Sequence, residues 1–266
     1  MSTKKESLNV PLKGNNKLKT ILEIIDSDIE LHTLWRCSNI LAIDRMGYSD
    51  HGPTHVKLVA NKAVKLLRML TAKNIDPSIK INYGMGVDDA EVVVLLASVM
   101  HDLGMSIIRE GHEVFSVELA REFLKRYLPL IYQSEEATIV SSETLHAIIC
   151  HQASVKPLTL EAGVVKIADA LDMERGRARI PYEAGRINIH SVSALSIEKV
   201  VIVEGVEKPI NIRIEMSNPA GIFQVDNLFA NKIKDSGLEK YIDIEVIVGE
   251  GKERFTFDES KLRLEA

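Results

Sequence analysis

An apolar run over residues 92–100 ends directly in the doublet His101-Asp102. A run of this length without Gly or Pro predicts a buried helix. Gly104 follows where such a helix would stop, so we expect it to adopt the left-handed conformation of a helix cap. The doublet is therefore predicted to lie at a buried helix end, where an imidazole nitrogen and a carboxylate could bind a cation.

Histidine is concentrated in the part of the chain around this doublet. Six of the eight histidines lie between positions 51 and 151, and carboxylates follow at Asp169 and Asp172. Each candidate ligand is expected at a helix end or on an inner helix face, so that all could converge on one metal centre. In chain order the candidate metal ligands are His55, His101, Asp102, His112, His151 and Asp169.

Helical periodicity dominates the first two thirds of the chain. The expected helices cover residues 17–46 with a break near 26–28, a segment from Pro53 to about residue 67, and residues 88–100, 112–128, 134–151 and 159–173. Residues 73–88 are expected to form a loop, and residues 1–16 a flexible N-terminus. We therefore expect a helical domain over residues 17–185.

The pattern changes near Arg186. Ile210, Ile212 and Ile214 alternate with polar residues, as do the apolar residues of 242–248, and this is the period of half-buried strands. Residues 196–203 and 254–257 are further strand candidates, with a helix expected over 226–234. Residues 186–266 are thus predicted to form a small β-β-α-β-β domain with helices on one face of an antiparallel sheet. It has no clustered His, Cys or carboxylate set, so we expect a role in dimerisation or substrate entry rather than catalysis.

Composition narrows the classes of function. A hydrophobic content of 45% and a charged content of 27% are those of an ordinary globular protein. No apolar run reaches membrane length and no signal core follows the N-terminus, so we expect a cytoplasmic protein without membrane contact. A net charge of −5 argues against nucleic-acid binding driven by bulk charge. The sequence leaves the oligomeric state open, with a homodimer as the commonest arrangement.

The order of the candidate ligands resembles the HD-domain metal-dependent phosphohydrolases, whose defining pattern is a His, a His-Asp doublet and a distant Asp. The resemblance implies a mostly α-helical HD-domain bundle, followed here by the small α+β domain, and the hydrolysis of phosphoesters. It covers roughly residues 45–180 and is carried by Asp50-His51-Gly52-Pro53-Thr54-His55, His101-Asp102-Leu103-Gly104, Gly111-His112-Glu113, Cys150-His151-Gln152 and Lys166-Ile167-Ala168-Asp169-Ala170-Leu171-Asp172.

Two additional histidines, His112 and His151, resemble those of the two-metal branch of the family, which includes cyclic-nucleotide and cyclic-dinucleotide phosphodiesterases. In that branch the residue matching Asp102 bridges the metals, and we place Asp102 and His101 at the catalytic centre. Imidazole and carboxylate ligands suit two ions of Mn, Fe, Ni, Co or Zn better than Mg. Cyclic-dinucleotide phosphodiesterases usually have a Lys after the Gly of the doublet, where this chain has Met105, so the resemblance names no substrate.

Candidate substrate contacts surround the predicted ligands. A guanidinium group binds phosphate with two parallel hydrogen bonds, which favours the arginines that follow the last predicted helix of the bundle. The same arginines could instead form a solvated or salt-bridged surface. His51 could equally be an ordinary loop residue. His146 is an alternative ligand, although we favour for it a role behind a ligand or in the core. Asp172 is expected to cap a helix, pair with an arginine or orient a ligand. The candidate substrate contacts are Arg175, Arg177, Arg179, His51 and Lys166.

Two functions of different classes follow. The first is a metal-dependent phosphohydrolase or phosphodiesterase that acts on a nucleotide or a related small phosphoester. The second is a metal-bound nucleotide sensor without turnover, whose C-terminal domain transmits the bound state. A degenerate sensor would be expected to have lost a ligand, and this chain has all six, so the enzyme is the favoured hypothesis.

Overall fold

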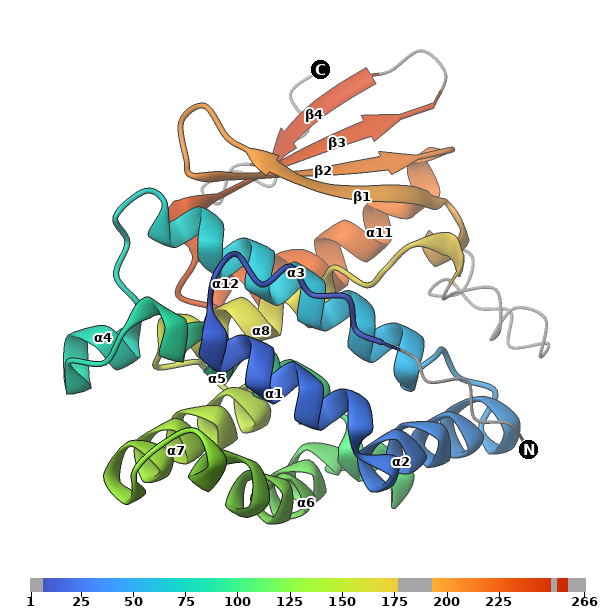
Figure 1. The fold of residues 1–266 in the computed structure, drawn as a ribbon. Coiled ribbons are helices and arrows are strands. Elements are labelled where there is room, and N and C mark those ends of the chain that lie inside the picture. Colours follow the sequence, from blue (N-terminus) through green and yellow to red (C-terminus); the bar gives the residue numbers. More distant parts are fainter. Residues whose placement is uncertain (1–6, 177–192, 250–252, 258–266) are drawn as a thin grey trace.

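The computed structural model describes residues 7–176, 193–249 and 253–257, in which a bundle of helices precedes a four-stranded sheet (Figure 1). The helical part comprises α1 (Asn16–Ser27), α2 (Ile29–Asn39), η1 (Ile40–Arg45), α3 (Pro53–Thr71), α4 (Ser78–Tyr83), α5 (Val87–Met100), η2 (Leu103–Ser106), α6 (His112–Tyr127), η3 (Leu128–Leu130), α7 (Ser134–Cys150) and α8 (Leu160–Ala170). The C-terminal part comprises β1 (Ile197–Glu204), β2 (Ile210–Met216), η4 (Pro219–Gly221), α11 (Ile222–Gln224), η5 (Val225–Ala230), α12 (Asn231–Lys234), η6 (Glu239–Tyr241), β3 (Ile242–Val248) and β4 (Glu253–Phe257). The predicted fold class, a mostly helical bundle with a small α+β unit, is confirmed.

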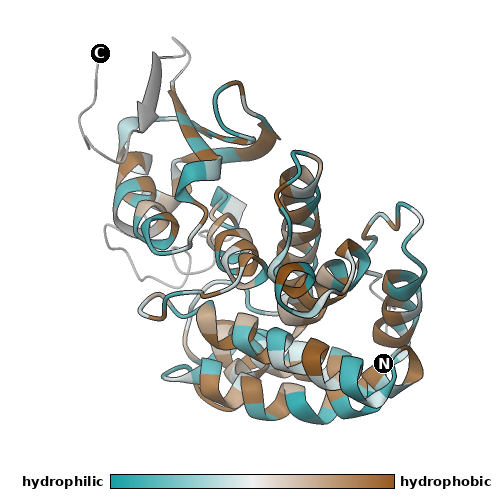
Figure 2. Cartoon of the chain, turned by 90° about the vertical axis from the view of Figure 1, so that its left-hand side faces the viewer, coloured by the Kyte–Doolittle hydropathy of each residue, from teal (hydrophilic) through white to brown (hydrophobic). Residues whose placement is uncertain are grey.

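Helix α5 is the centre of the bundle. Every residue from 89 to 100 is buried, and α5 packs against α3, α7 and α8. A helix enclosed on all sides needs apolar residues around its whole circumference, which explains its unbroken apolar run. The helices around it carry apolar and polar residues in alternating stripes (Figure 2). The end of α5 therefore delivers the doublet His101-Asp102 into the interior.

Residues 73–88, expected to form a loop, instead contain the short helix α4. The carboxylate of Glu161 on α8 accepts hydrogen bonds from the backbone N–H groups of Ser78 (3.1 Å) and Ile79 (3.0 Å). These donors belong to the first turn of α4 and have no partner within the helix. The helix thus depends on a cap from a distant part of the chain, which the local sequence pattern does not reveal.

The N-terminal segment is packed where the structure describes it, in contrast to the expected flexibility of residues 1–16. Leu8 and Val10 are buried in the core. Arg68 on α3 donates to the carbonyl oxygen of Pro11 (2.6 Å), and Asn61 donates to that of Leu8 (2.9 Å). Residues 7–15 are therefore fixed along α3, and residues 1–6 lie outside the described part.

The sheet has the order β1-β2-β3-β4, and its central pair β2 and β3 runs parallel. This corrects the prediction of an antiparallel sheet, although the outer pairs are antiparallel as expected. Residues 217–241 connect β2 to β3 through the helical segment 222–234, and a crossover of this kind returns the chain to the same end of the sheet. The buried residues Ile210, Ile212 and Ile214 of β2 face the side of the sheet that α3 and this segment cover (Figure 1).

The sheet and the bundle share a continuous hydrophobic core. Lys65 on α3 donates to the carbonyl oxygen of Ile202 on β1 (2.7 Å), and the N–H of Val200 donates to Glu174 (2.9 Å). The predicted domain boundary at residue 185 lies outside the described residues and stays a prediction. Within the described ranges, the structure contains no helix with the length and apolarity needed to span a membrane.

The bundle and the C-terminal unit come close together at Gly163 of α8. A Cβ atom at this position would lie 2.4 Å from the carbonyl oxygen of Ser236. Only a residue without a side chain allows the two backbones to come this near.

We predict that Gly163→Ala destabilises the protein by about 1–3 kcal/mol, because the added methyl group must displace backbone rather than a flexible side chain. The shift of the urea unfolding midpoint measures this effect. Gly176→Ala is the matched control, since a Cβ atom there meets nothing within 4 Å. Equal midpoints for the two variants would contradict the close approach.

Candidate metal centre

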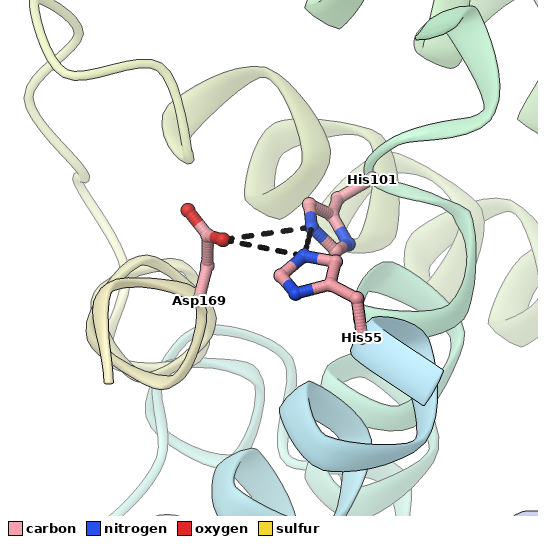
Figure 3. A group of neighbouring side chains, drawn as sticks. All are labelled: His55, His101 and Asp169. Carbon is pink, nitrogen blue, oxygen red and sulfur yellow. Dashed lines mark hydrogen bonds and ion pairs between the residues drawn. The ribbon is translucent and has the colours of Figure 1, made fainter. Parts of the chain in front are cut away.

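Three side chains from separate helices form the first candidate metal group. His55 lies in the first turn of α3, His101 directly follows α5 and Asp169 lies in the last turn of α8. The Nε2 atoms of His55 and His101 are 3.1 Å apart, and they lie 3.4 and 3.8 Å from Oδ1 of Asp169 (Figure 3). Both histidines are buried, so the three ligand atoms meet in the interior of the bundle.

The second candidate group consists of Asp102, His112 and His151. Oδ1 of Asp102 lies 3.1 Å from Nε2 of His112 and 3.7 Å from Nε2 of His151. The two Nε2 atoms are 3.2 Å apart. Helices α6 and α7 thus supply this group in the same way as α3 and α8 supply the first.

Asp102 lies between the two groups. While its Oδ1 faces His112 and His151, its Oδ2 lies 3.3 Å from Nε2 of both His55 and His101. One carboxylate therefore presents one oxygen to each group. This is the arrangement needed for an anion that two cations share.

Three of the four imidazoles bind a backbone carbonyl three residues earlier in the chain. Nδ1 of His101 donates to Ser98 (2.8 Å), Nδ1 of His112 to Arg109 (2.8 Å) and Nδ1 of His151 to Ile148 (2.6 Å). A proton held on Nδ1 in this way leaves the lone pair of Nε2 for a metal.

The fourth imidazole, His55, is oriented by a carboxylate. Its Nδ1 lies 2.6 Å from Oδ2 of Asp172, which is also buried. Of the three roles expected for Asp172, the structure therefore shows the orientation of a candidate ligand. Its oxygen fixes the ring so that Nε2 points at the first group.

The donor set fits divalent cations. Two imidazole nitrogens that both carry lone pairs repel each other at 3.1 or 3.2 Å unless a positive charge lies near them, and each group contains one such pair. Each group also includes a carboxylate, which offsets the charge of a cation. Nitrogen and oxygen ligands in this combination suit transition-metal ions and zinc.

The electrostatics of the site favour positive charge at its centre. Burial alone would raise the pKa of Asp102, but the surrounding imidazoles, His101 foremost, hold that pKa well below its usual range. Burial would lower the pKa of both His101 and His112, but Asp102, together with weaker contributions from Asp169 at His101 and Glu113 at His112, raises both. Burial, reinforced by the charge of His101, lowers the pKa of His151 to about 3. His151 is therefore neutral, the form in which an imidazole binds metal.

Gly104 serves the site in a different way from the one expected. It lies within η2 rather than in a left-handed cap, and a Cβ atom on it would come within 2.0 Å of the carbonyl oxygen of His112. Its N–H donates to Ser116 of α6 (2.8 Å). The glycine thus lets α6 approach the end of α5, which brings His112 to Asp102.

The predicted substrate contacts have different positions. His51 is buried and its ring centroid lies 5.8 Å from that of His55, beside the first group. Arg175 is exposed at the end of a described segment, and Arg177 and Arg179 lie outside the described residues. The structure does not support a substrate contact for Lys166.

The ammonium group of Lys166 is engaged elsewhere. It donates to the carbonyl oxygens of Gln152, Ala153 and Val155, at 3.1, 3.1 and 2.7 Å, and the residue is fully buried. Three acceptors satisfy all three N–H donors of a lysine. Lys166 therefore stabilises the loop after α7. His146 has a similar role, since its Nε2 accepts from the N–H of Leu158 (3.1 Å).

Lys232 reaches the site without having been predicted there. Its ammonium nitrogen lies 2.5 Å from Oδ2 of Asp169. A single lysine in a short helix gives no recognisable signal in the sequence, and only the docking of α12 against α8 brings it near Asp169.

Comparisons with known proteins agree with this geometry. The family model of the HD domain matches residues 54–174, a range that contains all six candidate ligands. MJ1020, an uncharacterized protein of Methanocaldococcus jannaschii, is 42% identical over 241 residues, which cover 91% of this chain and 92% of that protein. The chain belongs to the HD-domain family. This HD-domain protein is thereby a member of the metal-dependent phosphohydrolase superfamily, and its two buried His/Asp groups could hold divalent metal ions.

We predict that Asp172→Ala weakens metal binding at the group of His55, His101 and Asp169 by about 10–100-fold, because His55 loses the partner that orients its ring. Calorimetric titration of the dialysed protein with Zn²⁺ measures this affinity. Asp172→Asn is the matched variant, since its amide oxygen can still accept from Nδ1, and we expect it to keep most of the affinity. An Asp172→Ala protein that binds Zn²⁺ as tightly as the unmodified protein would rule out this role.

Proposed function

We propose that this HD-domain protein is a two-metal phosphohydrolase that hydrolyses a nucleotide or a related small phosphoester. The observation that carries the proposal is the position of Asp102, whose two oxygens face two separate groups of imidazole nitrogens at 3.1 to 3.7 Å. A site for a single ion would not need a carboxylate shared in this way. In the proposed assignment His55, His101 and Asp169 would hold one ion, His112 and His151 would hold the other, and Asp102 would be shared by both.

Divalent ions bound there would activate a water molecule as the nucleophile and offset the charge that builds on the phosphoryl oxygens. The residues of the chain prepare this chemistry. Asp102 is kept ionised by its neighbours, and hydrogen bonds from Nδ1 keep the imidazoles oriented. Burial of the ligands excludes bulk water from their polar contacts, which strengthens each of them. The mixed donor set favours Mn, Fe, Ni, Co or Zn over Mg.

Contacts to the substrate are a further part of the proposal. His51 lies beside His55 and is a candidate to contact the phosphoryl group. Arg175 is exposed near the end of the HD domain, where a guanidinium could bind a phosphate by two hydrogen bonds. Arg177 and Arg179 continue the same cationic stretch in the sequence.

We predict that the purified protein supplied with Mn²⁺ releases phosphate or a nucleoside monophosphate from at least one phosphoester. A generic aryl phosphate and a panel of nucleotides and cyclic nucleotides are suitable substrates, with chelator-treated protein as the control. The absence of turnover on every substrate, with both ions bound, would contradict hydrolysis. It would favour the second hypothesis, a nucleotide sensor.

If Asp102 is shared by two ions, substitutions of the candidate ligands should lower the metal content by unequal amounts. Asp102→Ala should lose both ions and nearly all activity, because two cations are left without their shared anion. His112→Ala or His151→Ala should chiefly weaken one ion, since each contributes to a single group. We therefore expect close to two ions per chain in the unmodified protein, far fewer in the Asp102 variant and an intermediate number in the others.

Elemental analysis after dialysis measures these stoichiometries. Asp88→Ala is the matched control, because Asp88 is an exposed carboxylate in the first turn of the same helix α5. A single ion that survives the loss of both His112 and His151 would refute the two-metal mechanism while leaving the family assignment intact.

A further inference from the structure

Lys232 forms an ion pair with Asp169 across the junction of the two parts of the molecule. The 2.5 Å contact joins residues that are 63 positions apart in the chain. The side chains are only 22% and 13% exposed, so solvent and salt screen the charges of this pair far less than those of a surface ion pair. Burial alone would raise the pKa of Asp169, but the charge of Lys232, the strongest opposing influence, holds it well below its usual range.

The two oxygens of Asp169 have separate partners. Oδ1 faces the Nε2 atoms of His55 and His101, whereas Oδ2 points away from both rings, as Figure 3 shows. Lys232 binds Oδ2. The ammonium group therefore does not occupy the space between the three candidate ligand atoms. It contacts the carboxylate from behind and leaves Oδ1 directed at the metal group.

The backbone that carries Lys232 is firmly docked. Its neighbour Ile233 is buried, and so is Leu238 after the helix. The carbonyl oxygen of Ser236 lies so near Gly163 of α8 that a Cβ atom there would be 2.4 Å away. Helix α8 carries both Gly163 and Asp169, so the packing that positions the C-terminal unit also sets the distance between Lys232 and its carboxylate partner.

Lys166, which precedes Asp169 on α8, does not compete for this role. Its three N–H donors are bound to the three carbonyl oxygens of the loop after α7. Its pKa is lowered, chiefly by burial and further by the charge of Lys232.

We infer that Lys232 is a positioning residue of the metal centre, which holds Asp169 as a one-oxygen ligand and makes the C-terminal unit part of the metal site. A carboxylate whose second oxygen is bound has a fixed orientation, whereas a free one can rotate and loses affinity for the ion. The inference rests on the proposed function only for its consequence in catalysis, because metal binding is measured without any substrate.

A competing role for the charge of Lys232 would change the metal affinity in the opposite direction. If Lys232 acted mainly as a competing positive charge, its removal would tighten the binding of the ion at the group of His55, His101 and Asp169. If it positions Asp169, its removal weakens that ion. The direction of the change in affinity therefore separates the two roles.

The test is a titration of the full-length, dialysed protein with Mn²⁺, followed by the electron paramagnetic resonance signal of free Mn²⁺. For Lys232→Met we expect one of two ions to bind about 10–100-fold more weakly. This is the typical loss when a residue that hydrogen-bonds a metal ligand is removed. Lys232→Arg keeps the charge and should restore the affinity to within a few-fold. Lys234→Met is the matched control, because Lys234 is an exposed residue of the same helix, and it should leave both ions unchanged.

A double-mutant cycle assigns the effect to Asp169. In an Asp169→Asn background, Lys232→Met should cause no further loss, since the interaction it removes is already absent. Unchanged or tighter Mn²⁺ binding in Lys232→Met, or an equal loss in the Asp169→Asn background, would overturn the inference. If the unmodified protein hydrolyses no phosphoester yet the binding results hold, the proposed function fails and the positioning role stands.

Discussion

A buried carboxylate is stable only if positive charge or hydrogen-bond donors surround it, and Asp102 is placed where four imidazoles meet. The rest of the bundle serves this arrangement. Helix α5 delivers the doublet into the interior, and α3, α6, α7 and α8 each bring one further candidate ligand to it. The ligands are thus drawn from helices that only tertiary packing holds together. Stability and metal binding depend on the same helix contacts.

Much of the bundle and most of the candidate site could be predicted because their signals are local. The apolar run before His101 identifies a buried helix from its own residues, and Pro53 marks the start of α3 in the same way. The six candidate ligands follow a recognisable order in the sequence. For Asp172 the sequence leaves three roles open, and only its contact with Nδ1 of His55, which lies 117 residues away, distinguishes among them.

The features that escaped prediction depend on contacts between distant residues. Helix α4 needs the carboxylate of Glu161, and the parallel pairing of β2 with β3 depends on the path of the connection between them. Lys166 lies within a family motif, yet its length lets it reach the carbonyls of a neighbouring loop instead of the site. Lys232 lies outside every motif. The C-terminal unit, expected to be separate from the chemistry, therefore contributes a charge at the metal group.

The hydrogen bonds behind the ligands also have a consequence for how the centre assembles. His101, His112 and His151 each find the acceptor for Nδ1 three residues back, within their own turn of the chain. Their tautomers can be set as soon as each turn forms, before the helices meet. His55 differs, since its acceptor on Asp172 is 117 residues away. The first group of ligands is completed only when the two ends of the HD domain come together, so metal binding there reports that the whole domain has closed.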